Sequence, residues 1–478
     1  METLRIVYDG IEKVIPFYKG DTLLSVLRNN GYEISANCGG NGTCNKCKVY
    51  LVEGEKVTAV SSCKTLAKAD MRVILPSVRG EGLVTDAKIQ TDGEEGIGLA
   101  LDIGTTTLAF YFVDLATGET LKTLSCLNPQ SAFGADVISR VEYATNHGVN
   151  ELTQTLKMRI NGVISAFTKE FHQSVKRLAV TGNTVMLHIF AGEEIASFGK
   201  YPFTPAFLES RTFGAELGYQ AEEVLLLPSI SPFVGADITC GAVATRLTDT
   251  GTNLLVDLGT NGEMLLSHQG KLYATSVAAG PAFEGAGISC GMGGVEGAIS
   301  QISGEKDNLT LTTVGNVPPK GICGSGLVDG VACLLKQGVI DETGAFQTEA
   351  ESFTFAPTVS LTAGDVRAFQ LAKSAVRAGI ETLLKVANIT RVDRLFVCGG
   401  MGFYLNQDSA VKVGLFPESM REKIVSAGNT AGLGAKACLL SQKARASAFE
   451  IAKKAEVVSL SNRADFTELF MEHMFFPL

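Results

Sequence analysis

Four cysteines lie close together near the start of the chain, at a spacing that suits a bound metal centre. Cys38, Cys44 and Cys47 follow the pattern C-x5-C-x2-C, and Cys63 comes after fifteen intervening residues. A [2Fe–2S] cluster takes four thiolates, two on each iron. Zinc ribbons usually pair two C-x2-C knuckles, whereas this segment has one. We therefore predict a [2Fe–2S] cluster on these four cysteines, with zinc and four unliganded thiols as the alternatives.

A second pattern, an aspartate followed by x-Gly-Thr at the end of an apolar run, occurs twice. The copies are Asp102-Ile-Gly104-Thr105-Thr106 and Asp257-Leu-Gly259-Thr260-Asn261. In such a hairpin the backbone N–H groups and hydroxyls donate to phosphate oxygens, and the carboxylate can hold a hydrated Mg²⁺. One copy alone could be an ordinary turn. Two copies a domain's length apart predict a duplicated fold whose two lobes hold one nucleotide.

A third glycine motif, Gly399-Gly400-Met401-Gly402, follows a predicted strand at residues 394–397, as a turn that binds adenosine would. Three carboxylates, Asp102, Asp257 and Glu263, are the candidates for orienting a water that attacks the bound nucleotide. Their relative roles stay open at this point. His188 follows three apolar residues, and we expect it to be packed inside a helix rather than to bind a ligand.

The elements that must position these residues divide the chain into four parts. Residues 1–86 form a small α+β unit, with strands at 4–8, 13–17, 48–52 and 71–75 and a helix that carries an apolar face after Asp21. Residues 87–96 are a polar linker. We expect one ATPase lobe at residues 97–250 and the second at 251–478, which includes the C-terminal helices.

Composition narrows the class of protein. The 478 residues are 45% hydrophobic and carry a net charge of −9, which makes nucleic acid an unlikely partner. The first residues lack a basic head followed by an apolar run, and no apolar run approaches the length of a membrane span. We expect a cytoplasmic protein that uses neither nucleic acid nor a membrane. Its eleven cysteines suit metal binding better than disulfides in that compartment.

Both parts resemble known families. The N-terminal segment resembles the β-grasp [2Fe–2S] ferredoxins, and its five-residue gap between the first two cysteines is like that of the adrenodoxin branch. The order of glycine motifs resembles the superfamily of acetate and sugar kinases, heat-shock chaperone ATPases and actin. That resemblance implies two RNase-H-like α/β lobes with ATP and Mg²⁺ between them. It also implies that Gly104, Thr105, Thr106, Gly259, Thr260 and Asn261 cradle phosphates, while Asp102 and Asp257 serve the metal and the attacking water.

Nearly the whole chain resembles the ATP-dependent reductive activators of corrinoid proteins. The matching stretches are residues 128–140, 181–188, 279–285, 321–329 and 371–379. The resemblance implies that the cluster passes one electron to Co(II) of an oxidised corrinoid protein and restores Co(I), driven by ATP. Longer members carry a further segment between the ferredoxin domain and the first hairpin, where this chain has only its linker. Docking or dimerisation through that segment is therefore not carried over.

The expected partners are a corrinoid protein of a methyltransferase system and an upstream electron donor, with a homodimer as a further option. None of the five histidines stands in the D-x-H-x-x-G pattern of proteins that ligate cobalamin, so the cobalt belongs on the partner. Two other readings stay open. One is an activator of another low-potential metalloenzyme, such as a 2-hydroxyacyl-CoA dehydratase. The other is a redox-sensing nucleotide-binding module without turnover.

Overall fold

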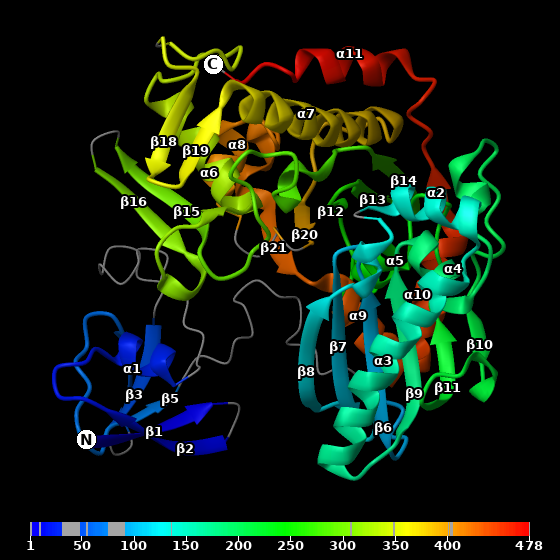
Figure 1. The fold of residues 1–478 in the computed structure, drawn as a ribbon, viewed down its shortest axis with the longest axis horizontal. Coiled ribbons are helices and arrows are strands. Elements are labelled where there is room, and N and C mark those ends of the chain that lie inside the picture. Colours follow the sequence, from blue (N-terminus) through cyan, green and yellow to red (C-terminus); the bar gives the residue numbers. More distant parts are fainter. Residues whose placement is uncertain are drawn as a thin grey trace.

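The computed structural model describes residues 2–8, 11–30, 48–53, 56–74, 91–134, 136–305, 308–347, 349–399, 401 and 405–477. These residues form a small N-terminal domain, coloured blue in Figure 1, and two larger α/β lobes. We use lobe I for the sheet that contains residues 97–127 and lobe II for the sheet that contains residues 253–277. The predicted cluster ligands Cys38, Cys44 and Cys47, and the predicted adenosine-turn residues Gly400 and Gly402, lie outside the described residues.

The N-terminal domain is a five-stranded sheet with one helix, in the strand order β2-β1-β5-β3-β4. Along β1, Leu4 and Ile6 are buried while Thr3 and Arg5 are exposed, the alternation expected of a strand with one face on the core. β1 pairs antiparallel with β2 and parallel with β5, which is the pairing of a β-grasp. Strand β4 was not predicted from the sequence. The elements are β1 (Glu2–Tyr8), β2 (Ile11–Phe17), α1 (Leu23–Asn29), β3 (Lys48–Glu53), β4 (Lys56–Ser61) and β5 (Arg72–Ile74).

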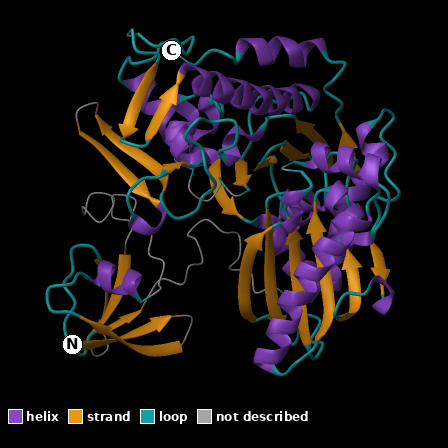
Figure 2. Cartoon of the chain, viewed as in Figure 1, coloured by secondary structure: helices purple, strands orange, loops and turns teal. Residues whose placement is uncertain are grey.

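Lobe I is a six-stranded sheet in the order β10-β11-β9-β6-β7-β8, with helices packed along it (Figure 2). β6 is buried over nearly its whole length because both of its faces are covered, and it accordingly reads as a continuous apolar run. Its strands are β6 (Ile97–Ile103), β7 (Thr107–Asp114), β8 (Thr120–Leu127), β9 (Val175–Gly182), β10 (Arg211–Phe213) and β11 (Ala221–Leu226). Its helices are η1 (Pro129–Ala132), α2 (Val137–His147), α3 (Asn150–Phe171), α4 (Thr184–Ala191), η2 (Ala196–Gly199), η3 (Ala215–Leu217) and α5 (Ala236–Ala244).

Lobe II repeats this plan in the order β21-β20-β12-β13-β14-β22. In each lobe an antiparallel three-stranded meander continues into two parallel strands, β9 and β11 in lobe I and β20 and β21 in lobe II. The predicted duplication is therefore present in the topology. The strands of this sheet are β12 (Asn253–Leu258), β13 (Gly262–His268), β14 (Lys271–Val277), β20 (Arg394–Cys398), β21 (Ile424–Gly428) and β22 (Ala455–Val457).

The remaining elements of lobe II surround this sheet. The long helix α7 begins with a capping box between Thr362 and Asp365 and lies beside the C-terminal helix α11 at the top of Figure 1. The remaining elements are η4 (Pro281–Glu284), β15 (Ala298–Glu305), β16 (Asn308–Thr313), η5 (Val314–Asn316), β17 (Gly321–Ile322), α6 (Gly324–Lys336), β18 (Ser352–Ala356), β19 (Val359–Thr362), α7 (Ala363–Val386), α8 (Gln407–Lys412), η6 (Glu418–Lys423), α9 (Thr430–Leu440), α10 (Gln442–Lys454) and α11 (Ala464–Glu472). None of the helices in the described part of the chain has both the length and the apolar content that a membrane crossing needs.

Helices α5 and α9 form the junction of the two lobes, and α5 packs against both of them. Ile238 of α5 is buried in one cluster with Leu255 of lobe II, whereas Leu439 of α9 is buried in the core of lobe I. At the crossing, a side-chain carbon on Gly434 would come within 1.9 Å of the Cys240 carbonyl oxygen, so the two helices are in direct contact. By packing, α9 thus belongs to lobe I although it follows lobe II in sequence. For the domain limits we propose residues 1–86 for the N-terminal domain, 87–96 for the linker, 97–250 for lobe I and 251–478 for lobe II.

Candidate functional site

The two predicted phosphate hairpins face each other between the lobes. The first is the β6–β7 turn, closed by a hydrogen bond from Gly104 N to Thr107 O (3.0 Å), and the second is the β12–β13 turn, closed from Gly259 N to Asn261 O (3.1 Å). Thr106 of the first turn and Thr260 of the second both donate to the same carboxylate, that of Glu284. The structure therefore brings together two motifs that are far apart in the sequence.

Four carboxylates lie beneath these turns. Burial raises the pKa of Asp102 to about 7, although the Asn429 amide donates to its carboxylate at 2.9 Å. Burial and then the charge of Asp237 raise the pKa of Asp257 to about 7. Burial and then the charge of Asp102 raise the pKa of Asp237 to about 6. Glu263 pairs opposite Asp257 across the β12–β13 ladder, and burial holds its pKa well above the usual range.

The carboxylate cluster of Asp102, Asp237, Asp257 and Glu263 fits a cation. Neighbouring carboxylates add to the effect of burial at each of the four, and among the described residues no lysine or arginine contributes to the shifts of their pKa values. Within the described ranges, no three acidic, histidine or cysteine side chains converge closely enough to ligate a metal alone. The mutual repulsion of these carboxylates suits Mg²⁺, which keeps several waters and takes its other ligands from one or two carboxylates and the phosphates.

Asp237 was missed in the sequence analysis. It stands in the first turn of α5, directly after Gly235-Ala236, and its side chain reaches the other three carboxylates only because α5 crosses toward lobe II. In the sequence, Asp237 is marked only as a single acidic residue in the otherwise apolar first turn of a helix. That signal is weak, since an acid in the first helical turn is also favoured by the helix dipole.

The predicted adenosine turn begins at Gly399, where the backbone has a φ of 88°. A side-chain carbon there would come within 2.5 Å of Asp257 Oδ1 and 2.7 Å of the Leu258 carbonyl oxygen. Only glycine fits both the conformation and the close approach. Gly399 therefore lies directly against the end of β12, the strand that leads into the second phosphate hairpin.

A buried arginine holds the first phosphate hairpin in position. Arg140 on α2 has no exposed surface, and its guanidinium donates to the carbonyl oxygens of Thr105 (2.7 Å) and Gly134 (3.0 Å). Asn183, which caps α4, donates to Thr105 Oγ1 at 3.2 Å. Burial lowers the pKa of Arg140 to about 10, so the side chain stays charged at neutral pH. Both contacts come from stretches that the sequence analysis had matched to the family, residues 128–140 and 181–188.

His188 is packed in α4, as predicted. Its Nδ1 lies 2.7 Å from the Thr184 carbonyl oxygen, and its Nε2 accepts hydrogen bonds from the backbone of Ala206 (3.0 Å) and Phe207 (3.3 Å). Burial lowers its pKa, and the two N–H donors require a neutral ring with the proton on Nδ1. His188 therefore fixes the loop around residue 206.

The predicted cluster site is described at one ligand only. Cys63 follows β4, is half-buried and packs against the core of the N-terminal domain. Its neighbours are anchored to α1, since Leu24 N donates to Ser62 O (3.1 Å) and Leu23 N donates to Thr65 O (2.8 Å). The other three cysteines lie outside the described residues, so the four-thiolate ligand set stays a prediction.

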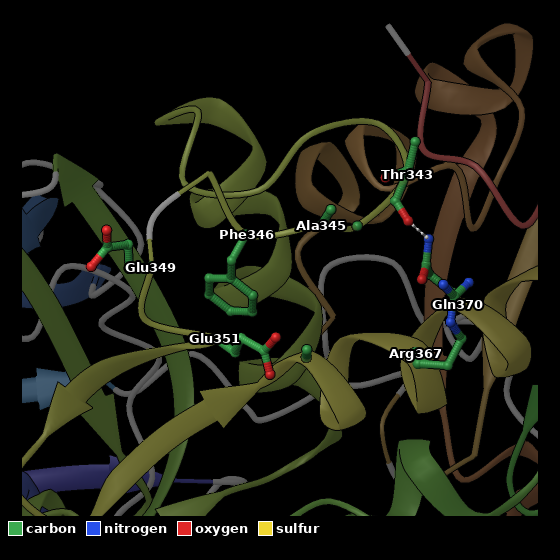
Figure 3. Close-up of a pocket in the computed structure, with 9 residues that line it drawn as sticks. Thr343, Ala345, Phe346, Glu349, Glu351, Arg367 and Gln370 are labelled. Carbon is green, nitrogen blue, oxygen red and sulfur yellow. Dashed lines mark hydrogen bonds between the residues drawn. The ribbon is translucent and has the colours of Figure 1, made fainter.

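A cavity of about 440 Å³ lies elsewhere on lobe II (Figure 3). Arg367 and Gln370 line one side, Glu349 and Glu351 line the other, and Phe346 lies between them. Gln370 bridges the Thr343 and Met474 carbonyl oxygens, each at 2.9 Å. The lining contains none of the predicted site residues.

Family models match the chain in three places. The 2Fe-2S iron-sulfur cluster binding domain matches residues 6–72, the RACo middle region matches residues 97–250, and the C-terminal domain of RACo, an ASKHA domain, matches residues 251–478. The corrinoid activation enzyme RamQ of Eubacterium limosum is 32% identical over 421 residues, which cover 79% of this chain and 70% of that protein.

Two further proteins match at similar length. The [Co(II) methylated amine-specific corrinoid protein] reductase of Methanosarcina barkeri is 28% identical over 396 residues, which cover 75% of this chain and 72% of that protein. The solved structure of a reductive activator for corrinoid, iron-sulfur protein superposes with a TM-score of 0.74 at 27% identity, covering 99% of this chain and 98% of that one.

Proposed function

The chain belongs to the RACo family of corrinoid-activating proteins, and we propose that it uses ATP to pass one electron from a [2Fe–2S] cluster to Co(II) of a corrinoid protein, restoring Co(I) for methyl transfer. The observation that carries the proposal is the joining of a [2Fe–2S] domain and a duplicated ASKHA fold in one chain. An electron carrier alone needs no ATP, and a kinase needs no cluster. Their combination supports an electron transfer that consumes ATP.

The need for ATP follows from redox energetics. Plant-type [2Fe–2S] clusters have potentials of about −400 mV, too high to reduce the most negative acceptors without help. For a one-electron couple, 59 mV corresponds to about 1.4 kcal/mol. Closure of the two lobes around ATP is the step that would supply this free energy. Helices α5 and α9 link the lobes at one junction and leave the two hairpins to face each other.

The nucleotide residues have separate roles in this proposal. Phosphate oxygens accept hydrogen bonds from the turns that contain Gly104, Thr105 and Thr106 in lobe I and Gly259, Thr260 and Asn261 in lobe II. Adenosine lies against the turn that begins at Gly399, with Gly400 and Gly402 as its further predicted residues. Mg²⁺, when bound, neutralises phosphate charge above the carboxylate cluster.

The carboxylates differ in what they can reach. Asp102 and Asp257 are each partly exposed between the lobes, and their raised pKa values, near 7, let them exchange a proton with water near neutral pH. Glu263 is only 6% exposed and lies 3.5 Å from the Gly235 backbone nitrogen. We assign the attacking water to Asp102 or Asp257 and treat Glu263 as a residue that positions them.

In this proposal the electron passes from the cluster to the cobalt of the partner. Cys38, Cys44, Cys47 and Cys63 would hold the cluster, which when bound supplies a carrier for one electron. The cobalt is on the partner, because the histidines do not form the pattern that ligates cobalamin. The upstream donor, a homodimer and a cytoplasmic location stay predictions.

Partner-dependent ATP hydrolysis tests the proposal. We expect slow turnover of ATP by the protein alone and faster turnover when a Co(II) corrinoid protein from the same source is added anaerobically. A redox-sensing binding module would show no turnover with any partner. Turnover that ignores corrinoid proteins but responds to another metalloenzyme would replace the proposed acceptor.

A further inference from the structure

Glu284 lies between the two phosphate hairpins and contacts both of them. Its Oε1 accepts hydrogen bonds from Thr260 N at 2.7 Å and from Thr260 Oγ1 at 2.9 Å. Its Oε2 accepts one from Thr106 Oγ1 at 3.1 Å. One carboxylate therefore joins the first hairpin, in lobe I, to the second hairpin, in lobe II.

The short helix that carries Glu284 is firmly anchored. Gly280 and Gly285 bound η4 with φ values of 79° and 81°, a conformation that favours glycine. Phe283 is 3% exposed and its ring lies 6.0 Å from that of Phe369 on α7. A side-chain carbon on Gly324 would come within 2.0 Å of the Phe283 carbonyl oxygen, so the backbone of η4 is held against α6. Glu284 itself is half-buried and extends from this fixed support.

The hydrogen-bond donors that contact Glu284 are the donors that a phosphate would need. A carboxylate and a phosphate both present anionic oxygens to N–H and O–H donors, and such charge-assisted hydrogen bonds are stronger than neutral ones. Thr106 and Thr260 are the residues that we assign to phosphate. A phosphate oxygen and the Glu284 carboxylate therefore compete for the same three donors, and two anions at that distance also repel each other.

We propose that Glu284 is a latch, which holds the phosphate donors of both hairpins in the nucleotide-free protein and is displaced by the phosphates of ATP or ADP. The latch rests on the proposed nucleotide site. In the free protein the Glu284 carboxylate bridges the two lobes. When a nucleotide binds, its phosphates replace that carboxylate as the acceptor for the hairpin donors. Glu284 thus acts as a positioning residue.

Nucleotide affinity of two variants tests the latch. Glu284→Ala removes the competing carboxylate, and we expect ADP and a non-hydrolysable ATP analogue to bind at least tenfold more tightly, which corresponds to about 1.4 kcal/mol. Glu284→Gln keeps one acceptor but no charge and should lie between Glu284→Ala and the wild type. Adenosine, which has no phosphate to compete with Glu284, should bind all three proteins alike. The matched control is Glu296→Gln, an exposed acid on the same segment, which should bind all ligands like the wild type.

Hydrogen exchange at the Thr260 amide gives an independent measurement. Without nucleotide, that amide should exchange more slowly in the wild type than in Glu284→Ala, because Glu284 accepts its hydrogen bond. Excess ADP should make the two proteins alike. Equal or weaker ADP binding by Glu284→Ala, with normal binding by the wild type, would overturn the latch while leaving the nucleotide site intact. A wild type that binds neither ADP nor the ATP analogue would overturn both.

Discussion

The raised pKa of Asp257 predicts that removing its charge stabilises the nucleotide-free protein. A pKa of about 7 instead of 3.8 makes ionisation cost about 4 kcal/mol more in the folded chain than in the unfolded chain. Asp257 is partly exposed, and solvent screens part of this cost. We therefore expect Asp257→Asn to raise the free energy of unfolding by about 2 kcal/mol, half of that limit, at pH 8 without Mg²⁺.

The sign of the effect depends on pH. Between pH 4 and 7 the folded protein holds a proton on Asp257 that the unfolded chain has lost, so wild-type stability falls as the pH rises through this window. Above pH 7 both states are ionised and the cost is constant. The advantage of Asp257→Asn should therefore be full at pH 8 and drop to about half at pH 5.5.

The assay is thermal unfolding of both proteins in EDTA at the two pH values, with Glu222→Gln on the exposed side of β11 as a control for removing one surface carboxylate. The control should unfold like the wild type at both pH values. Mg²⁺ with ADP should then stabilise the wild type more than the variant, since a cation offsets the charge cluster. A variant less stable than the wild type at pH 8, or a gain that is the same at pH 5.5, would refute the reasoning.

Further outcomes follow from single side chains. Asp102→Ala should abolish ATP-dependent cobalt reduction but leave the visible spectrum of the cluster intact, and a changed spectrum would contradict separable domains. Cys63→Ser should lose most cluster absorbance while ATP binding, measured by calorimetry, stays within twofold. Arg140→Ala should cost about 3 kcal/mol of stability, because it leaves buried carbonyls unpaired, and it should weaken ATP binding. Normal ATP binding by Arg140→Lys would contradict a role for the guanidinium, which donates to two carbonyl oxygens at once. The lowered pKa of His188 implies stability that is full above pH 6.5 and declines below it, and a denaturation series should show that His188→Asn lacks this decline.

Most of the correct predictions of site residues and of the fold rested on short local motifs. The hairpin residues Gly104 and Gly259, and the carboxylates Asp102 and Asp257, follow from short patterns with a direct physical purpose, and the structure places all four together. The duplicated fold was predictable for the same reason, because the second copy appears at a domain's length from the first. Four of the five strands of the N-terminal domain were also predicted, and β4 was missed.

Contacts between distant segments were not predictable in this way. Glu284 stood in a stretch that had been matched to the family, but its bond to Thr106 spans 178 residues and has no local pattern. Asp237 joins the other carboxylates only because α5 crosses between the lobes. Periodicity shows which face of a helix is apolar, but it does not show which sheet that face covers. The packing of α5 against both lobes, and of α9 against lobe I, therefore had to come from the structure.

The central claim is tested most directly by the absorbance of Co(I). A Co(II) corrinoid protein from the same source is mixed anaerobically with this protein and a reductant, with and without ATP and Mg²⁺. We predict that the Co(I) band rises only when ATP and Mg²⁺ are present. Hydrolysis of ATP without Co(I) from any such corrinoid protein would contradict the account and point to a different metalloenzyme as the acceptor.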